Sequence, residues 1–424
     1  MTGRRLGAGG AGLGLVLLLF AGPPARGAEV ALGPSRFDMP AVFEGWTRRE
    51  AGDGLVFERV FEPTGSRGRK GAAILIVAKP KPASGRFDDA FAASVRSLKQ
   101  IPSDDKPLTA KTGETLDGHR IRVEQRCCRT RDGIRMSAWH IGIATKTSEH
   151  FLMLLMLQIE REQEKPIREG FEALVRSYRP TPEDRGLVLA PARGDGGLDG
   201  LYSRTRTQLR PNAFGGMDFT ADQDTLLFDK GGFYTTDFPR DGDMAAHCRA
   251  EPTTCGTYTL KGGWFSANRI ERVEVEDGFG RVSRTSEAFS RAKDRLTLGD
   301  VTYFAVPPFA DGHRFDGTWN HSFGSSGAMG SVGGTHTLTL TPDGRFTREG
   351  GVGFSSTGGS MDGSTGVAGH SRRPVRAGRY TISGYRLTLT DDGGSSEALS
   401  LFAPDRASDK LLVIGGANYL KQGR

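Results

Sequence analysis

The chain has 424 residues, of which 60 are glycine and 37% are hydrophobic, and its formal net charge is +7. This length exceeds one ordinary domain and suggests about three. A small positive charge spread over so long a chain does not form the basic surface that nucleic acid requires, so nucleic acid is excluded as an expected partner.

Residues 1–27 have the three parts of a secretion signal. Arg4 and Arg5 supply the positive start, residues 13–20 are apolar (LGLVLLLF), and small residues precede and include Gly27, as a signal peptidase requires. The apolar part is shorter than the roughly 20 residues that span a bilayer. We therefore expect cleavage after Gly27, export to the periplasm or the extracellular space, and no stable membrane insertion of the mature chain.

Residues 28–182 are expected to form one α+β domain. Apolar runs predict strands at 55–61, 72–78, 107–112, 119–127, 135–145 and 150–159. Apolar stripes at helical spacing predict helices at 87–100 and 166–178, the second beginning at Pro166. The stripes predict burial of Phe91, Val95, Phe171 and Leu174. The order of elements predicts an antiparallel sheet with its helices packed on one side.

The same region carries a family resemblance. Its opening segment, 37–46, reads Phe-x-Met-Pro…Gly-Trp, and its closing helix ends in Ser177-Tyr178. With these residues and this order of elements, the domain resembles the PsbP-like family of α/β/α sandwiches. The resemblance implies a non-catalytic extrinsic or interaction module and carries over no functional residue. An unrelated α+β domain is the alternative.

Beyond a linker at 183–196, rich in proline, glycine and charge, the sequence repeats itself. Residues 197–309 and 313–424 share landmarks in the same order, among them 198–202 with 315–319, Tyr258 with Tyr380, and Tyr303 with Tyr419. Alternating runs between turn signals predict about seven or eight strands in each copy, enough to close a small barrel. We expect each copy to close on itself; one larger shared barrel is the alternative.

The first strand of the second copy opens with Gly317-Thr318-Trp319, where the first copy has Gly-Leu-Tyr at 200–202. The Gly-x-Trp sequence is similar to the start of the lipocalin family. That resemblance implies a small barrel able to hold an apolar small molecule. A small barrel or sandwich of another family remains open.

The four cysteines form two pairs whose members are close in sequence. Cys248 and Cys255 are expected to form a disulfide, because export favours oxidation and the loop is short. With His247 they could instead supply three metal ligands, but a fourth is missing locally. Cys127 and Cys128 are neighbours, whose Cα atoms lie about 3.8 Å apart, below the usual disulfide span of about 4.4–6.8 Å. We expect two thiols on opposite faces of one strand, with a vicinal bridge as the alternative.

Sequence motifs of catalysis are not evident. The chain has no Gly-x-Ser-x-Gly, His-Glu-x-x-His or Gly-x-x-x-x-Gly-Lys sequence. His140 is expected to be an ordinary strand residue. The Gly/Ser-rich stretches 323–334 and 350–369 are expected to be mobile loops, since no helix follows them to complete a phosphate site.

These observations predict an exported, non-catalytic binding or scaffold protein of the bacterial cell envelope, with no cofactor and with other envelope proteins as partners. One alternative is a lipocalin-like carrier of an apolar small molecule. A hydrolase with a dispersed active site is a further alternative. The sequence assigns no catalytic, cofactor-binding or metal-binding residue, and it leaves the ligand unidentified.

Overall fold

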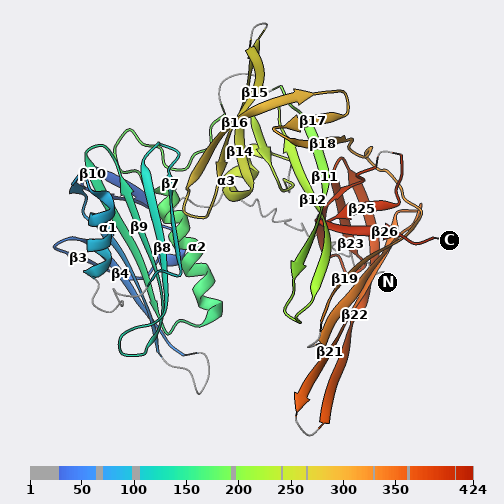
Figure 1. Cartoon of the computed structure of the whole chain (residues 1–424), viewed down its shortest axis with the longest axis horizontal. Helices are drawn as coiled ribbons and strands as arrows, with labels where there is room; N and C mark the ends of the chain where they lie inside the picture. Colours follow the sequence, from blue (N-terminus) through green and yellow to red (C-terminus); the bar gives the residue numbers. More distant parts are fainter. Residues whose placement is uncertain are drawn as a thin grey trace, which may run out of the picture.

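The computed structural model describes residues 28–63, 70–97, 106–191, 197–239, 242–263, 266–327, 330–360, 363–405 and 407–423. The expected secretion signal lies outside these ranges. Figure 1 shows an arch, with a sheet module at the left, a first barrel at the top and a second barrel at the right. Within the described ranges, no helix has both the length and the apolar character needed to cross a membrane.

The N-terminal module is built on one antiparallel sheet with the strand order β3-β4-β5-β10-β9-β8-β7. Its strands are β3 (Thr47–Ala51), β4 (Gly54–Phe61), β5 (Gly71–Ala78), β7 (Thr109–Glu114), β8 (Arg120–Arg129), β9 (Arg135–Ala144) and β10 (Ser148–Leu157). The short strand β6 (Lys81–Pro82) pairs with β10, and β1 (Glu29–Leu32) pairs with β2 (Ser35–Asp38). The predicted strands are thus confirmed to within two residues at each end.

The two predicted helices are present as α1 (Phe87–Arg96) and α2 (Arg161–Ser177). The second begins five residues before Pro166, so the expectation that this proline starts the helix is wrong. The four residues predicted to be buried, two from each helix, are all buried. The amphipathic spacing therefore identified the inner face of each helix correctly.

The helices do not share one side of the sheet. The α2 residues Ile167, Phe171 and Leu174 pack in one core with Leu152, whereas α1 packs on Phe151. Successive residues of a strand point to opposite faces, so the two helices cover opposite faces and the one-sided expectation is wrong. The physical reason lies in β10, whose apolar run is buried on both faces and needs a cover on each.

Each of the two repeats closes into an eight-stranded antiparallel barrel. The first barrel contains β11 (Gly200–Pro211), β12 (Met217–Phe228), β13 (Phe233–Thr235), β14 (Cys255–Gly263), β15 (Ser266–Val275), β16 (Val282–Arg291), β17 (Arg295–Leu298) and β18 (Val301–Val306). It closes through the pairing of β18 with β11, and β15 pairs with β16 along the ring. The helix α3 (Met244–Ala250) lies between β13 and β14.

The second barrel repeats this plan. It contains β19 (Gly317–Gly327), β20 (Gly330–Leu340), β21 (Arg345–Ser360), β22 (Gly363–Ser383), β23 (Arg386–Asp391), β24 (Ser396–Phe402), β25 (Leu411–Ile414) and β26 (Ala417–Lys421). It closes through the pairing of β19 with β26. Neighbouring strands pair within each copy around both rings, so the alternative of one larger shared barrel is excluded.

The matched tyrosines play the same part in both barrels. Each hydroxyl accepts a hydrogen bond from the segment that enters the barrel and donates one to the carbonyl that begins a turn. The partners are Leu198 N (3.1 Å) and Asp229 O (3.0 Å) for Tyr258, and Phe315 N (2.9 Å) and Thr341 O (3.0 Å) for Tyr380. The Tyr258 hydroxyl also lies 2.8 Å from a second acceptor, Leu198 O. The sequence repeat is therefore a structural repeat down to single hydrogen bonds.

The Gly/Ser-rich stretches of the second copy are strands, so the expectation of loops is wrong. They belong to β19, β20, β21 and β22, which pair along their length and project beyond the barrel at the lower right of Figure 1. A strand ladder is made by backbone groups and needs no large side chain. The small side chains of these glycine- and serine-rich stretches therefore did not prevent the strands from pairing.

Inserted aromatic side chains join the three bodies. Phe279, in the turn between β15 and β16 of the first barrel, belongs to the core of the N-terminal module and lies 5.0 Å from the ring of Trp139. Between the barrels, the Tyr385 hydroxyl donates to the carbonyl of Val306 at 2.7 Å and accepts from the N–H of Leu201 at 3.3 Å. The N-terminal module is thus joined to the first barrel, and the first barrel to the second, by side chains that pack or form hydrogen bonds across each junction.

Candidate functional site

The deep part of each barrel is filled with side chains. The first holds a cluster that includes Tyr202, Phe228, Tyr234, Tyr258, Ile270 and Leu296; the second holds one that includes Trp319, Leu338, Phe346, Tyr380, Leu387 and Leu412. Open space remains beside charged residues: ≈ 450 Å³ next to Asp224 and Arg272 in the first barrel, and ≈ 150 Å³ next to Arg348 and Glu397 in the second. These spaces are lined by polar groups, unlike the apolar interior that the lipocalin resemblance implies.

A cavity with mainly apolar walls lies instead in the N-terminal module. It has a volume of ≈ 550 Å³ and is bounded by α1, by the outer face of the central strands and by the turn between β3 and β4. Its apolar lining comes from Val56, Ile76, Ala78, Ala90, Ala93, Phe151 and Met153. It has the size and the composition that small-molecule sites in proteins usually have.

One polar group in this cavity is His140, which projects from β9 towards α1. The side chain is only 4% exposed, and its Nε2 lies 3.2 Å from Ser94 Oγ on α1. The ring also packs edge-on against Phe91, with the ring centres 5.3 Å apart. Burial lowers the pKa of His140 to about 4. At neutral pH the imidazole is therefore uncharged and can act as one donor and one acceptor.

Another polar group of the cavity is Glu149, at the start of β10, whose cross-strand partner Lys81 also lines the cavity. It is 2% exposed, and its Oε1 accepts hydrogen bonds from the backbone N–H of Ser84 at 3.0 Å and from the Ser84 hydroxyl at 2.7 Å. Its Oε2 has no hydrogen-bond partner among the described residues. A buried carboxylate is costly unless its oxygens are satisfied, so this oxygen is suited to a donor group of a ligand.

Within the described part of the chain, Ser94 and His140 lack the free carboxylate that would complete a catalytic triad with them. The nearest cross-strand carboxylate, Glu124, is paired through both oxygens, with Arg122 at 2.6 Å and with Arg126 at 3.0 Å. A general base also works best with a pKa near the working pH, whereas that of His140 is lowered to about 4. The group is better suited to hydrogen bonding than to proton transfer.

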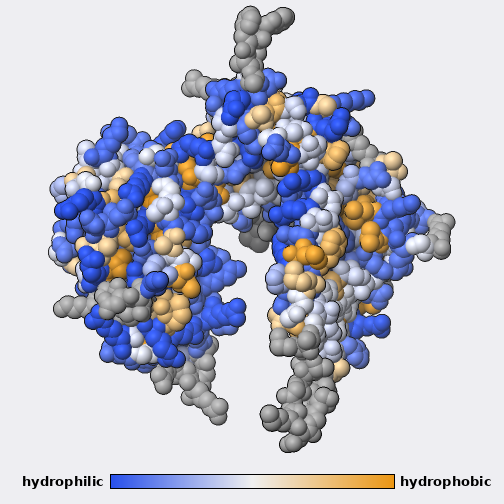
Figure 2. All heavy atoms as spheres, viewed as in Figure 1, coloured by the Kyte–Doolittle hydropathy of each residue, from blue (hydrophilic) through white to orange (hydrophobic). Residues whose placement is uncertain are grey.

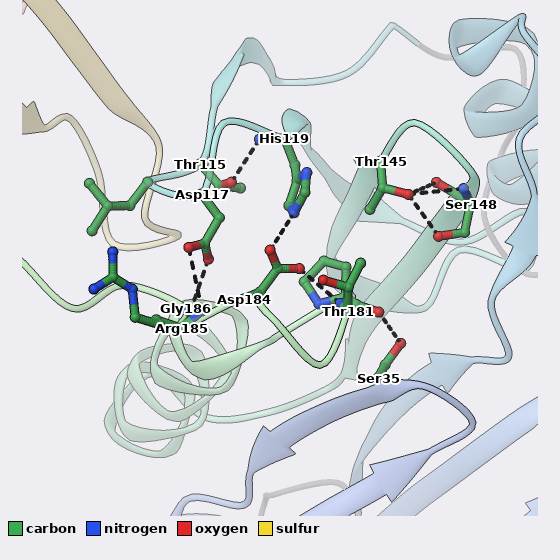
Figure 3. Close-up of polar contacts among 12 residues, drawn as sticks. Ser35, Thr115, Asp117, His119, Thr145, Ser148, Thr181, Asp184, Arg185 and Gly186 are labelled. Carbon is green, nitrogen blue, oxygen red and sulfur yellow. Dashed lines mark hydrogen bonds and ion pairs between the residues drawn. The ribbon is translucent and has the colours of Figure 1, made fainter.

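Other, partly buried polar residues connect the end of this module to its sheet. Figure 3 shows Asp184 between His119 and Thr181; its oxygens lie 2.9 Å from His119 Nε2 and 2.8 Å from Thr181 N. Asp117 accepts from the backbone N–H of Gly186 at 3.0 Å. Residues 184–187 of the expected linker are therefore packed on the module, whereas Leu189 packs against Met244 and Cys248 of the first barrel.

The cysteines lie in two pairs at bonding distance. The Sγ atoms of Cys248 and Cys255 are 2.12 Å apart, which fits the expected disulfide, and His247 lies near Thr235. The Sγ atoms of Cys127 and Cys128 are 2.10 Å apart, so the expectation of two separate thiols is wrong. That expectation assumed a trans peptide, whereas this peptide is cis and the Cα atoms are only 3.1 Å apart.

Sequence reasoning placed His140 correctly in a strand and missed its surroundings. Ser94 lies in the predicted helix 87–100, but the helical stripe alone does not say which strand the helix meets. Glu149 adjoins the predicted strand 150–159, and its polarity beside an apolar run is the one local signal that it has a special partner. Only the assembled module brings these residues around one cavity.

Comparison with known proteins adds no name to this site. No protein-family model matches the chain, and no curated protein and no solved structure is similar to it.

Proposed function

We propose that this chain is an exported, non-catalytic binding protein whose N-terminal module holds a small ligand beneath α1. The proposal is carried by the ≈ 550 Å³ cavity, which combines apolar walls with the open carboxylate oxygen of Glu149. The ligand it fits is mainly apolar and bears an amine or another hydrogen-bond donor. His140, uncharged at neutral pH, supplies a second polar contact.

The two barrels serve as a scaffold in this proposal. Their filled cores favour a structural role over carriage of an apolar molecule in a hollow interior. Exposed apolar side chains on their surface offer contacts to other envelope proteins; Leu209, Met217 and Phe219 on the hairpin of β11 and β12 are more than half exposed. Figure 2 shows hydrophobic residues over these strands on the side that faces the viewer.

The cavity can be tested with Nile red, an uncharged apolar dye whose fluorescence rises on leaving water. Ala90 lines the cavity, and Ala92 on the same helix does not. We expect Ala90→Phe to weaken dye binding about ten-fold or more by filling the space, and Ala92→Phe to leave it within about two-fold. Equal dye binding by both variants would show that the dye, and the proposed ligand, does not use this cavity.

The role of Glu149 can be tested by competition. Dodecylamine and dodecanol have the same chain and differ in the head group, so we expect the amine to displace Nile red at a lower concentration from the wild-type protein. Glu149→Gln should remove this preference, because the neutral amide has lost the charge that attracts the ammonium group. A preference that persists in Glu149→Gln would assign amine recognition to another residue.

A further inference from the structure

The open ends of the two barrels differ although the barrels repeat one plan. In the first barrel, Arg204 pairs with Asp224 at 2.8 Å, across the β11–β12 pair. The same two positions in the second barrel hold His321 and His336, which are direct cross-strand partners on β19 and β20. A matched cation and anion in one copy thus correspond to two histidines in the other.

A further cation distinguishes the second barrel. Arg348 and Arg376 both reach Oε2 of Glu397, each at 3.1 Å, so this carboxylate is shared by two guanidinium groups. Arg373, on the same strand as Arg376, lines the same space and has no ion-pair partner among the described residues. The space is lined by three arginines and by the two carboxylates of Glu349 and Glu397, so it holds one more cation than anions.

His336 responds to this positive surrounding. Partial burial, together with the neighbouring side chains of Arg348, His321 and Arg373, lowers the pKa of His336. His336 and Arg373 line one space of ≈ 150 Å³ between β20, β21, β22 and β24. A space of this size admits a single phosphate or carboxylate group.

One aromatic side chain lies beside the two histidines of this open end. Phe323 lies beside His321 and His336, with ring centres 5.9 and 5.5 Å away, and is 38% exposed. An anionic group that enters here would therefore meet the Phe323 ring beside His336.

We infer that the open end of the second barrel is an oxyanion site, in which Arg373 and His336 bind a phosphate or carboxylate group. Arginine recognises such groups through paired N–H donors, and the imidazole adds a further N–H donor. The first barrel lacks the site because its corresponding residue Asp224 is acidic. This inference does not rest on the cavity beneath α1 and stands or falls separately from it.

Inorganic phosphate is the first probe. The ring proton signals of His336, assigned with His336→Gln, can be titrated with pH at increasing phosphate. We expect phosphate to raise the His336 pKa with a saturable dose response, because a bound anion favours the protonated ring. Arg373→Ala should weaken the apparent affinity about ten-fold, while Arg372→Ala, which removes the same charge from the neighbouring position that does not line the space, should leave it within about two-fold.

Vesicles separate the two sources of such a group. Co-sedimentation with phosphatidylcholine vesicles, with and without phosphatidylglycerol, would show whether a lipid head group enters the site. Binding to anionic vesicles that is lost in Arg373→Ala and kept in Arg372→Ala supports a lipid source; phosphate binding without vesicle binding supports a small soluble anion. Equal behaviour of the two variants in both assays, or no response of His336 to phosphate, would overturn the inference.

Discussion

Two histidines are buried in the N-terminal module as uncharged side chains. His140 contacts Ser94, and His150 lies 3.0 Å from the Tyr178 hydroxyl through Nδ1 and 2.7 Å from the Ser148 hydroxyl through Nε2. Burial lowers the pKa of each to about 4, from an ordinary value of 6.5. Both residues therefore remain neutral in the folded protein under conditions in which the unfolded chain already takes up protons.

This difference predicts a loss of stability in weak acid. Between pH 6.5 and about 4 the unfolded chain binds more protons at these sites than the folded chain does, so stability falls as the pH falls. The slope is about 1.4 kcal/mol per pH unit for each histidine. Urea unfolding at pH 7.5 and pH 5.0 should show a loss that is about 2 kcal/mol smaller in His140→Gln than in the wild-type protein.

The matched control is His370→Gln, since His370 is exposed on β22. Its pH dependence should equal that of the wild-type protein. An unchanged slope in His140→Gln would mean that His140 is protonated equally in both states, contrary to its burial.

At the scale of single elements, the two barrels use one device to secure their entering segments. Tyr258 and Tyr380 lie at matched positions on β14 and β22, and each accepts a hydrogen bond from the backbone N–H of the segment that leads into its barrel. Both tyrosines are buried. A buried donor that loses its acceptor is costly, so the contribution of each hydroxyl can be measured.

Tyr258→Phe and Tyr380→Phe should each lower the free energy of unfolding by about 1–3 kcal/mol. Hydrogen exchange should quicken at the amide of Leu198 in the first variant and at that of Phe315 in the second. Tyr303→Phe is the control, because its hydroxyl has no hydrogen-bond partner among the described residues. Faster exchange across the whole barrel in the absence of a local effect would show that the hydroxyl contact is not the cause.

The pair Cys248 and Cys255 secures another element of the first barrel. The two residues join α3 to the start of β14 and pack with Met244 and Phe233. On the loop-closure model, a bridge around so small a ring stabilises by no more than about 2–3 kcal/mol. Replacing both cysteines by alanine should therefore increase hydrogen exchange in α3 while the barrel stays folded. A global loss of barrel protection would contradict this limited role.

At the scale of the whole molecule, the N-terminal module and the first barrel share a core. Phe279 is 5% exposed and lies among residues of the N-terminal sheet and of α2, with the ring of Phe171 6.0 Å away. Beside it, Arg281 donates to the carbonyl of Thr112 on β7 at 2.9 Å, and Val282 pairs with Glu114. The N-terminal module and the first barrel are therefore joined by a packed interface.

Phe279→Ala should destabilise this contact by about 3–5 kcal/mol, the usual cost of emptying a buried phenylalanine site. We expect a larger radius of gyration by small-angle X-ray scattering as the module separates from the barrel. Phe304→Ala, at a half-exposed position, should cost less than about 1 kcal/mol and leave the scattering unchanged. An unaltered radius in Phe279→Ala would mean that other contacts suffice to hold the two bodies together.

Features that depend on local pattern could be predicted from the sequence alone. The apolar runs of β5 and β10 and the helical stripes of α1 and α2 identify these elements because burial imposes a period on each. The duplication determined the number of barrels and the match of Tyr258 with Tyr380, since two copies of one sequence fold by the same rules. Closure of each copy followed from its having enough strands to remove exposed edges.

Only the tertiary structure decided the features that join distant segments. An apolar stripe on a helix says that one face is buried but not which sheet face covers it, so α1 and α2 lay on opposite sides against expectation. The glycine-rich strands were missed because glycine and serine do not produce the alternation of apolar and polar residues that identifies a strand in a sequence. Their pairing is made by backbone groups alone. The contacts of Ser94 with His140, of Ser84 with Glu149 and of Phe279 with its neighbouring module span 46, 65 and more than 100 residues, distances over which no local pattern acts.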